Sequence, residues 1–220
     1  MAIGDEGSNP PRPARSADGI VLRPRRAEDF DASYTTTPAW DIDRPQPALL
    51  AVATAGEVRG RVLDVGCGTG EHALMAAAAG LVAVGVDAAR AAIERAELKA
   101  QERGLTPRFV VGDALELSFL GQLGPFDTVL DSGLFHIFDD VDRGRYVDNL
   151  AVVMPPGGRY FMVCFSDRTP GDWGPRRVTE AEIRDSFCDG WRIDSVEATR
   201  MVLTHMPDGV PAWVASVTRT

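Results

Sequence analysis

Residues 62–70 read Val-Leu-Asp-Val-Gly-Cys-Gly-Thr-Gly, and this stretch decides the fold of the chain. An apolar strand pattern runs into three glycines spaced G-x-G-x-G, and a helical pattern follows over 71–79. Such a turn presents backbone N–H groups and the positive end of a helix dipole to a ligand. Because glycines permit close approach of a ligand to the backbone, the stretch predicts a ligand site between a strand and a helix.

Strand and helix patterns alternate after this loop. Strands are expected at 61–65, 81–86, 108–111, 126–131 and 158–165, and helices at 71–79, 88–103, 141–154 and 180–187. This alternation predicts a doubly wound α/β sheet. Strands 191–202 and 212–217 have no helix between them, and a turn containing Pro207, Gly209 and Pro211 joins them, so they should pair antiparallel. The predicted fold is a Rossmann-like, mostly parallel sheet of seven strands with helices on both faces and a C-terminal antiparallel hairpin.

Composition divides the chain into three parts. Residues 1–27 are rich in proline without an apolar period and are expected to form a flexible tail. Residues 28–60 combine aromatic residues and prolines with an apolar stretch, and they predict an N-terminal lid and helix. Residues 61–220 form the sheet domain.

The bulk composition excludes several classes of protein. With 23 Lys plus Arg against 32 Asp plus Glu, the formal net charge of −9 repels phosphate backbones and anionic lipid surfaces. The three cysteines are far apart, no secretory signal precedes the domain, and no metal-ligand spacing occurs. We therefore expect a cytoplasmic protein with no nucleic-acid partner, no membrane association and no bound metal; monomer and homodimer both stay open.

Acidic residues end three consecutive predicted strands. Asp64 precedes the glycines, Asp87 ends the second strand, and Asp113 ends the third. Each alone is typical of a turn or a helix cap, but their joint placement after a glycine loop indicates one site. A carboxylate at Asp64 suits a sulfonium-bearing amino acid and would repel a pyrophosphate, while Asp87 can accept hydrogen bonds from both ribose hydroxyls.

Together with Gly85-Val86-Asp87, Gly112-Asp113-Ala114 and Pro156-Gly157-Gly158, residues 62–70 resemble the successive motifs of class I S-adenosylmethionine-dependent methyltransferases. The resemblance covers about residues 61–165 well. It implies S-adenosyl-L-methionine as the cofactor, bound across the strand ends. The closing hairpin agrees with it, because most dinucleotide-binding folds end in another parallel strand.

Two further stretches resemble one branch of that family. Residues 38–47 read Pro-Ala-Trp-Asp-Ile-Asp-Arg-Pro-Gln-Pro, and residues 131–136 read Asp-Ser-Gly-Leu-Phe-His. Both are similar to the thiopurine methyltransferase-like branch, which includes halide, thiol and heterocyclic-toxin methyltransferases; Asp43 departs from the glycine common there. The resemblance implies that Trp40 closes the site and that Gln46 lies near the methionine end. The cofactor-binding residues expected in all are Trp40, Gln46, Asp64, Gly66, Cys67, Gly68, Gly70, Asp87, Ala88, Asp113, Ala114 and Asp131.

The acceptor side is expected around the end of the fourth strand. His136 is the candidate general base, because a phenol or a ring N–H must lose a proton on methylation. A cap of the next helix or a loop hydrogen bond would explain the same histidine. Phe135 would wall an aromatic acceptor, and Trp173 and Arg176 in the loop 166–177 would contact it.

These features predict methyl transfer to a small-molecule nucleophile by in-line displacement. The acceptor class stays open among phenols or quinols, N-heterocycles, thiols and halides. Two alternatives are an NAD-linked oxidoreductase, which the G-x-G-x-G spacing and the hairpin disfavour, and a catalytically silent cofactor-binding module.

Overall fold

A seven-stranded sheet runs through the computed structural model, which describes residues 27–220. Its strands are β1 (Arg61–Val65), β2 (Val82–Asp87), β3 (Arg108–Val111), β4 (Thr128–Ser132), β5 (Arg159–Phe165), β6 (Trp191–Leu203) and β7 (Met206–Arg219). The strand order is β3-β2-β1-β4-β5-β7-β6; β1 to β5 are parallel, and β7 is antiparallel to both β5 and β6. The predicted fold class is confirmed. The tail expected at 1–27 lies, apart from Ala27, outside the described residues.

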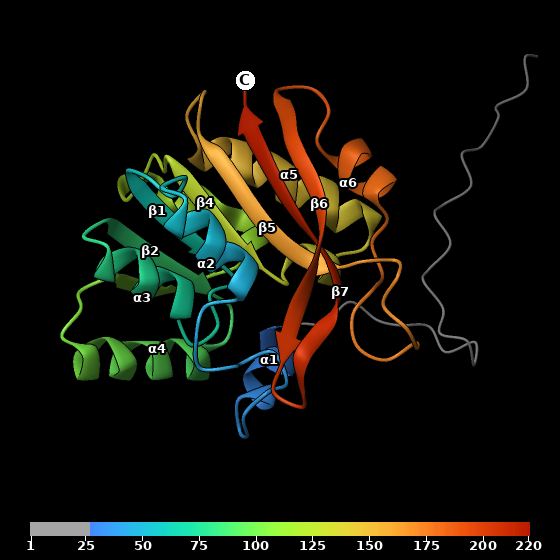
Figure 1. The fold of residues 1–220 in the computed structure, drawn as a ribbon. Helices are drawn as coiled ribbons and strands as arrows, with labels where there is room; N and C mark the ends of the chain where they lie inside the picture. The colour runs from blue at the N-terminus through green and yellow to red at the C-terminus, as the bar shows by residue number, and fades with distance from the viewer. Residues whose placement is uncertain (1–26) are drawn as a thin grey trace, which may run out of the picture.

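Helices cover both faces of this sheet (Figure 1). They are α1 (Ala27–Ser33), α2 (Pro47–Thr54), α3 (Glu71–Ala78), α4 (Arg90–Arg103), α5 (Asp140–Val153) and α6 (Glu180–Ser186), with the 3-10 segments η1 (Ala114–Gln122) and η2 (Phe135–Ile137). α2, α3 and α4 lie on one face, in front in the figure, and α5 and α6 lie behind. Since both faces are covered, β1 alternates between two cores: Val62 packs on the α2 and α3 side, and Leu63 on the α5 side.

The C-terminal hairpin turns earlier than the sequence predicts. Its turn is Thr204–His205, so Pro207, Gly209 and Pro211 lie inside β7 and the predicted turn was wrong. β5 ends opposite Ala212, which leaves the first part of β7 paired with β6 alone. Prolines are tolerated in a strand segment that has one neighbour, because a missing N–H costs a ladder hydrogen bond only toward a paired strand.

Within residues 28–60, where a lid and a helix were expected, residues 34–46 connect α1 with α2 and pass over the glycine loop. The backbone N–H of Thr204 at the hairpin turn donates to the Ala39 carbonyl at 2.8 Å. At the other end, Arg95 of α4 donates to the carbonyl oxygens of Tyr34 and Thr36. Residues far apart in the sequence therefore hold this segment, hereafter the cover segment, across the end of the sheet.

Candidate cofactor and acceptor site

The glycine loop follows β1 in a left-handed backbone conformation. Gly66, Gly68 and Gly70 have φ values of 65°, 53° and 86°. A Cβ atom on Gly70 would lie 2.6 Å from the Phe109 ring, and one on Gly68 would lie 2.9 Å from the hydroxyl oxygen of Tyr34. These positions require glycine both for φ and for space, as expected where a backbone passes close to other groups.

Asp64 lies fully buried behind this loop. Its Oδ2 accepts a hydrogen bond from the Ala73 N–H at 3.0 Å, and Oδ1 has no hydrogen-bond partner. Burial raises the pKa of Asp64 to about 8, with smaller contributions from the nearby carboxylates Asp87 and Asp131. A buried acid with a spare oxygen fits a cationic ligand group, which would both satisfy that oxygen and favour ionisation.

The other two strand-end acids have backbone partners. Asp87 accepts hydrogen bonds from the N–H groups of Gly68 and Ala89, both at 2.8 Å, and burial raises its pKa. It thereby fastens the glycine loop to the end of β2, beside the half-buried Ala88. Asp113 is exposed and caps η1 through the Leu115 N–H at 2.9 Å, immediately before the buried Ala114. Both acids therefore make hydrogen bonds to backbone N–H groups, as expected for the turn or helix-cap residues that each of them could be when taken alone.

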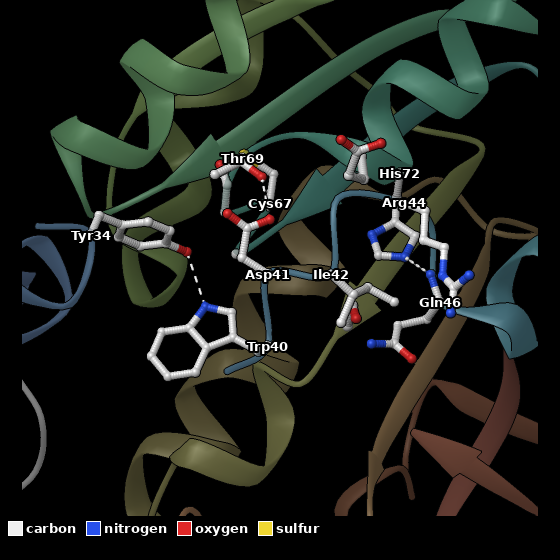
Figure 2. Close-up of a pocket in the computed structure, with 13 residues that line it drawn as sticks. Tyr34, Trp40, Asp41, Ile42, Arg44, Gln46, Cys67, Thr69 and His72 are labelled. Carbon is white, nitrogen blue, oxygen red and sulfur yellow. Dashed lines mark hydrogen bonds between the residues drawn. The ribbon is translucent and has the colours of Figure 1, made fainter. Parts of the chain in front are cut away.

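Two aromatic side chains of the cover segment lie over the loop (Figure 2). The indole N–H of Trp40 donates to the Tyr34 hydroxyl at 3.1 Å, and the rings meet edge to face at 6.3 Å. Tyr34 is buried against Gly68. Tyr34 was not expected at the site, because a lone aromatic residue in an irregular segment gives no periodic signal.

A cluster of charges fastens the middle of the cover segment. Lys99 of α4 lies 2.7 Å from Asp43, 2.8 Å from Glu71 and 2.9 Å from the Thr69 hydroxyl, which itself donates to Asp41 at 2.8 Å. Asp43 is the one non-glycine residue of the described chain with positive φ, at 56°. We call these five residues the Lys99 cluster. The sequence gives no sign of it, because its members come from three separate stretches, 41–43, 69–71 and residue 99.

Gln46 ties the end of the cover segment to β6. Its side-chain amide donates to the Val202 carbonyl and accepts from the Val202 N–H, each at 2.9 Å. Its own backbone N–H donates to Nε2 of His72 at 3.1 Å, and Nδ1 of His72 lies 3.9 Å from Asp64. Burial lowers the pKa of His72 to about 4. The amide of Gln46 is therefore committed to β6, although the residue lines the cavity.

Asp131 at the end of β4 is enclosed by donors of the protein itself. The carboxylate is fully buried and accepts from the N–H groups of Leu134 and Phe135 and from the hydroxyls of Tyr146 and Tyr160, at 2.7 to 3.1 Å. Burial raises its pKa to about 6, although these hydrogen bonds oppose the shift. The strand end presents Ser132 to the cavity instead.

Phe135 and His136 are buried in η2. Phe135 has no exposed surface and stacks on Phe187 at 5.9 Å, so it lies in the core and not in a wall of the cavity. Nδ1 of His136 accepts a hydrogen bond from the Phe165 N–H at 2.9 Å. Burial, with contributions from Arg177 and Arg143, lowers the pKa of His136 to about 3.

The loop after β5 packs on these residues. Trp173 is 36% exposed and meets Phe165 and His205 edge to face at 5.8 and 6.3 Å. The guanidinium of Arg177 fixes the loop by donating to five carbonyl oxygens, those of Thr169, Pro170, Gly171, Trp173 and Pro175. Arg176 instead forms ion pairs with Asp140 of α5 and Glu182 of α6, so its guanidinium links these two helices.

One cavity joins the cover segment and the glycine loop. Its lining residues are Tyr34, Trp40, Asp41, Ile42, Arg44, Gln46, Gly66, Cys67, Gly68, Thr69, Glu71, His72 and Ser132. Five of the expected cofactor residues thus come together: Trp40, Gln46, Gly66, Cys67 and Gly68. The buried thiol of Cys67, whose pKa burial raises, packs beside Gly85. His136, Trp173 and Arg176 do not line this cavity.

The chemistry of the cavity fits an S-adenosylmethionine molecule. Two carboxylates line it, Asp64 offers an unpartnered buried oxygen behind it, and the Trp40 indole can face a sulfonium cation. Within residues 27–220 no three His, Cys, Asp or Glu side chains are placed to hold a metal ion. None of the helices in that range is long and apolar enough to cross a bilayer.

Comparisons with known proteins agree on one family. The Methyltransferase domain model matches residues 62–158. The 2-heptyl-1-hydroxyquinolin-4(1H)-one methyltransferase of Mycobacteroides abscessus is 38% identical over 183 residues, covering 78% of this chain and 80% of that protein.

Solved structures extend the likeness to three dimensions. One comes from work on the conversion of a disulfide bond into a thioacetal group during echinomycin biosynthesis; it has a TM-score of 0.80 at 36% identity and covers 88% of this chain and 93% of that one. Magnesium protoporphyrin IX methyltransferase from Synechocystis PCC 6803, solved with bound SAM, shares the fold with a TM-score of 0.60 at 24% identity, covering 78% of this chain and 76% of that one.

Proposed function

Since this chain belongs to the class I S-adenosylmethionine-dependent methyltransferases, we propose that its acceptor is a small molecule and that a hydroxylated N-heterocycle is the first candidate. The family membership decides against the NAD-linked oxidoreductase. The observation that carries the proposal is the cover segment. It closes the cavity through Tyr34, Trp40 and the Lys99 cluster, and a site closed in this way suits a small acceptor better than a polymer.

Each part of the cavity has a proposed role toward the cofactor, which when bound supplies an electrophilic methyl group on its sulfonium. Asp64 accepts from the cofactor's ammonium group, and Asp87 accepts from its ribose hydroxyls. The glycine loop lets backbone N–H groups approach the ligand closely. Trp40 lies with its ring toward the cation, and the cover segment keeps out water that would compete with the acceptor.

The finer assignment is to the thiopurine methyltransferase-like branch. It rests on residues 38–47 and 131–136, whose first stretch supplies Trp40 and Gln46 to the cavity lining. The M. abscessus relative is described as acting on a 1-hydroxyquinolin-4-one, a flat heterocycle with an acidic N-hydroxyl. Methyl transfer is an in-line displacement, so alignment of such a flat acceptor with the methyl carbon is the main task of the site.

The test is a panel of acceptors with isotopically labelled S-adenosylmethionine. It comprises 2-heptyl-1-hydroxyquinolin-4(1H)-one, an alkyl thiol, a thiophenol, a quinol, iodide and a short RNA, each with and without the protein. We expect label in the quinolone product at a kcat/KM at least about 10-fold above that for the quinol, in line with the selectivity of a matched pocket. Label in RNA alone, or in no acceptor despite cofactor binding, would contradict the proposal.

A further inference from the structure

The hydrogen bonds of His136 fix its tautomer. A backbone N–H can only donate, so Nδ1 of His136, which accepts from Phe165 at 2.9 Å, carries no proton. The neutral ring then has its proton on Nε2. This nitrogen lies 3.3 Å from the point where a Cβ atom on Gly133 would stand, and Gly133 directly follows Ser132, the residue at the end of β4 that lines the cavity. His136 therefore offers a donor, and not a basic nitrogen, to a neighbour at the end of β4.

The other two histidines offer no replacement base inside the cavity. Nε2 of His72 accepts from the Gln46 N–H, so its proton lies on Nδ1, toward Asp64. His205 is exposed in the hairpin turn and packs on Trp173. The cavity carboxylates Asp41 and Glu71 are engaged by Thr69, Lys99 and Arg103. Among the described cavity residues, no side chain is placed to take a proton from an acceptor.

Two buried or half-buried arginines flank His136. The Arg143 guanidinium lies 4.7 Å from the centre of the Phe135 ring, is 4% exposed, and has two donors, Nε and Nη2, without partners. The Arg177 guanidinium lies 5.4 Å from the centre of the Phe165 ring, against which the His136 imidazole packs. Besides burial, Arg143 and Arg177 are the charged groups that lower the pKa of His136, and Asp131 lies close by, where it accepts from the Phe135 N–H.

Arg143 also has acidic neighbours, but they leave it incompletely neutralised. Its Nη1 lies 3.6 Å from Glu182 and 3.9 Å from Asp140, and both of these acids are shared with Arg176 at shorter distances. A buried guanidinium with unmet donors is costly unless an anion or a polar group is brought near it. Arg143 therefore has two donors, Nε and Nη2, available for a polar or anionic group beside Phe135 and His136.

We propose that the acceptor enters as a preformed anion, a thiolate or an N-oxyanion, and that the Nε2–H of His136 donates a hydrogen bond to it while Arg143 and Arg177 supply the positive potential. This proposal rests on the proposed function and names the charge state of its acceptor. It replaces the general-base role that the sequence suggested for His136.

The chemical step is then simple to balance. The acceptor loses its proton to water before it binds. Its lone pair forms the bond to the methyl carbon as the carbon–sulfur bond breaks, and the electron pair of that bond stays on the sulfur. No proton moves in this step. The negative charge of the acceptor and the positive charge of the sulfonium cancel as the new bond forms. Before that step, the hydrogen-bond donor and the two nearby cations stabilise the bound anion without protonating it.

The first test needs no variant. The pH dependence of kcat/KM is measured for ring-substituted thiophenols and 1-hydroxyquinolin-4-ones of graded acidity. We expect each profile to rise with pH and to level off at the acceptor's own pKa, so that the inflection moves from acceptor to acceptor. One inflection at the same pH for every acceptor would identify a base on the enzyme and overturn the proposal.

The second test compares His136→Gln with His136→Leu. The glutamine amide can place a donor near the position of Nε2, whereas leucine removes it. We expect His136→Leu to lower kcat/KM about 10- to 100-fold with unchanged inflections, and His136→Gln to recover most of that loss. Equal losses in both variants, with native circular dichroism and an unchanged Kd for S-adenosylhomocysteine, would contradict the donor role.

A binding readout separates this proposal from the proposed function. The absorbance of 4-nitrothiophenol distinguishes thiol from thiolate, and it is titrated in the complex with S-adenosylhomocysteine, where no transfer occurs. We expect the pKa of the bound thiol to fall below its value in water, and Arg143→Met to reverse part of that fall. A raised pKa of the bound thiol would overturn the anion site even if the enzyme methylates thiols, whereas failure of the acceptor panel would leave this result intact.

Discussion

At the residue scale, the sequence predicts the residues whose role follows from their position at the end of a strand. It misses the residues whose role depends on a contact with a distant part of the chain. The glycines and Asp64 are found from spacing alone; in the structure Gly66 and Gly68 line the cavity and Asp64 lies behind it. The tautomer of His136 depends on the backbone of Phe165, which is 29 residues away. No local pattern reveals such a contact, and the expectation of a base followed from residue type only.

The stability of the cofactor-free protein should depend on Asp64. Its pKa is about 8 in the fold against 3.8 as the ordinary value, so between these values the folded chain keeps a proton that the unfolded chain loses. This contribution is complete below about pH 4 and is lost as the pH rises through about 8, at up to about 1.4 kcal/mol per pH unit.

The variant Asp64→Asn keeps the shape of the side chain without the titration. Denaturant unfolding of both proteins measures the effect. It is carried out from about pH 4.5 to about pH 8, the range between the ordinary pKa of Asp64 and its pKa in the fold. We expect the free energy of unfolding of the wild type to fall relative to the variant as the pH rises. The lowered pKa of His136 affects both proteins alike and cancels in the difference. Parallel curves would show that Asp64 is ionised in the free protein.

At the scale of elements, the strands and helices were predicted closely, and the errors have physical causes. β1 and β3 have the expected bounds, whereas β4 begins at Thr128, two residues later than expected. The hairpin turn was misplaced because prolines and a glycine usually mark turns, yet here they occupy the part of β7 that lacks β5 as a neighbour. η1 was not predicted, since a 3-10 segment has no strong apolar period.

The cover segment should open more readily without Lys99. Its ammonium bridges Asp43 and Asp41 of the segment to Thr69 and Glu71 of the body, and it is only 18% exposed. We expect Lys99→Met to raise the dissociation rate of S-adenosylhomocysteine about 3- to 10-fold, the effect of losing one to two modest ion pairs. Stopped-flow fluorescence, in which Trp40 is the reporter, measures this rate.

The salt dependence and a matched variant complete that test. Added salt should speed dissociation from the wild type and have less effect on Lys99→Met, because the screened interaction is already gone. Arg184→Met removes an exposed ion pair with Glu180 on α6 and serves as the control. Equal rates for all three proteins would mean that the cover segment is held by its other contacts, those of Gln46, Thr204 and Arg95, and not by Lys99.

At the scale of the whole molecule, charged groups gather in two places. Asp41, Arg44 and Glu71 line the cavity under the cover segment, with Asp64 behind it, and Arg143 and Arg177 lie about His136. The fold and the cofactor follow from the alternation of elements and from strand-end acids, which are visible in the sequence. The two arginines near His136 are not visible there as a pair, because they lie on separate segments and come together only in three dimensions.

The central claim is that the cavity beneath the cover segment holds the cofactor, and hydrogen–deuterium exchange tests it most directly. Exchange of the intact protein is followed by mass spectrometry with and without saturating S-adenosylhomocysteine. The account predicts slower exchange in residues 34–46 and in the glycine loop 66–70, with the middle of β6 unchanged. Protection confined to the loop 166–177 or to α6, with residues 34–46 exchanging as before, would contradict it.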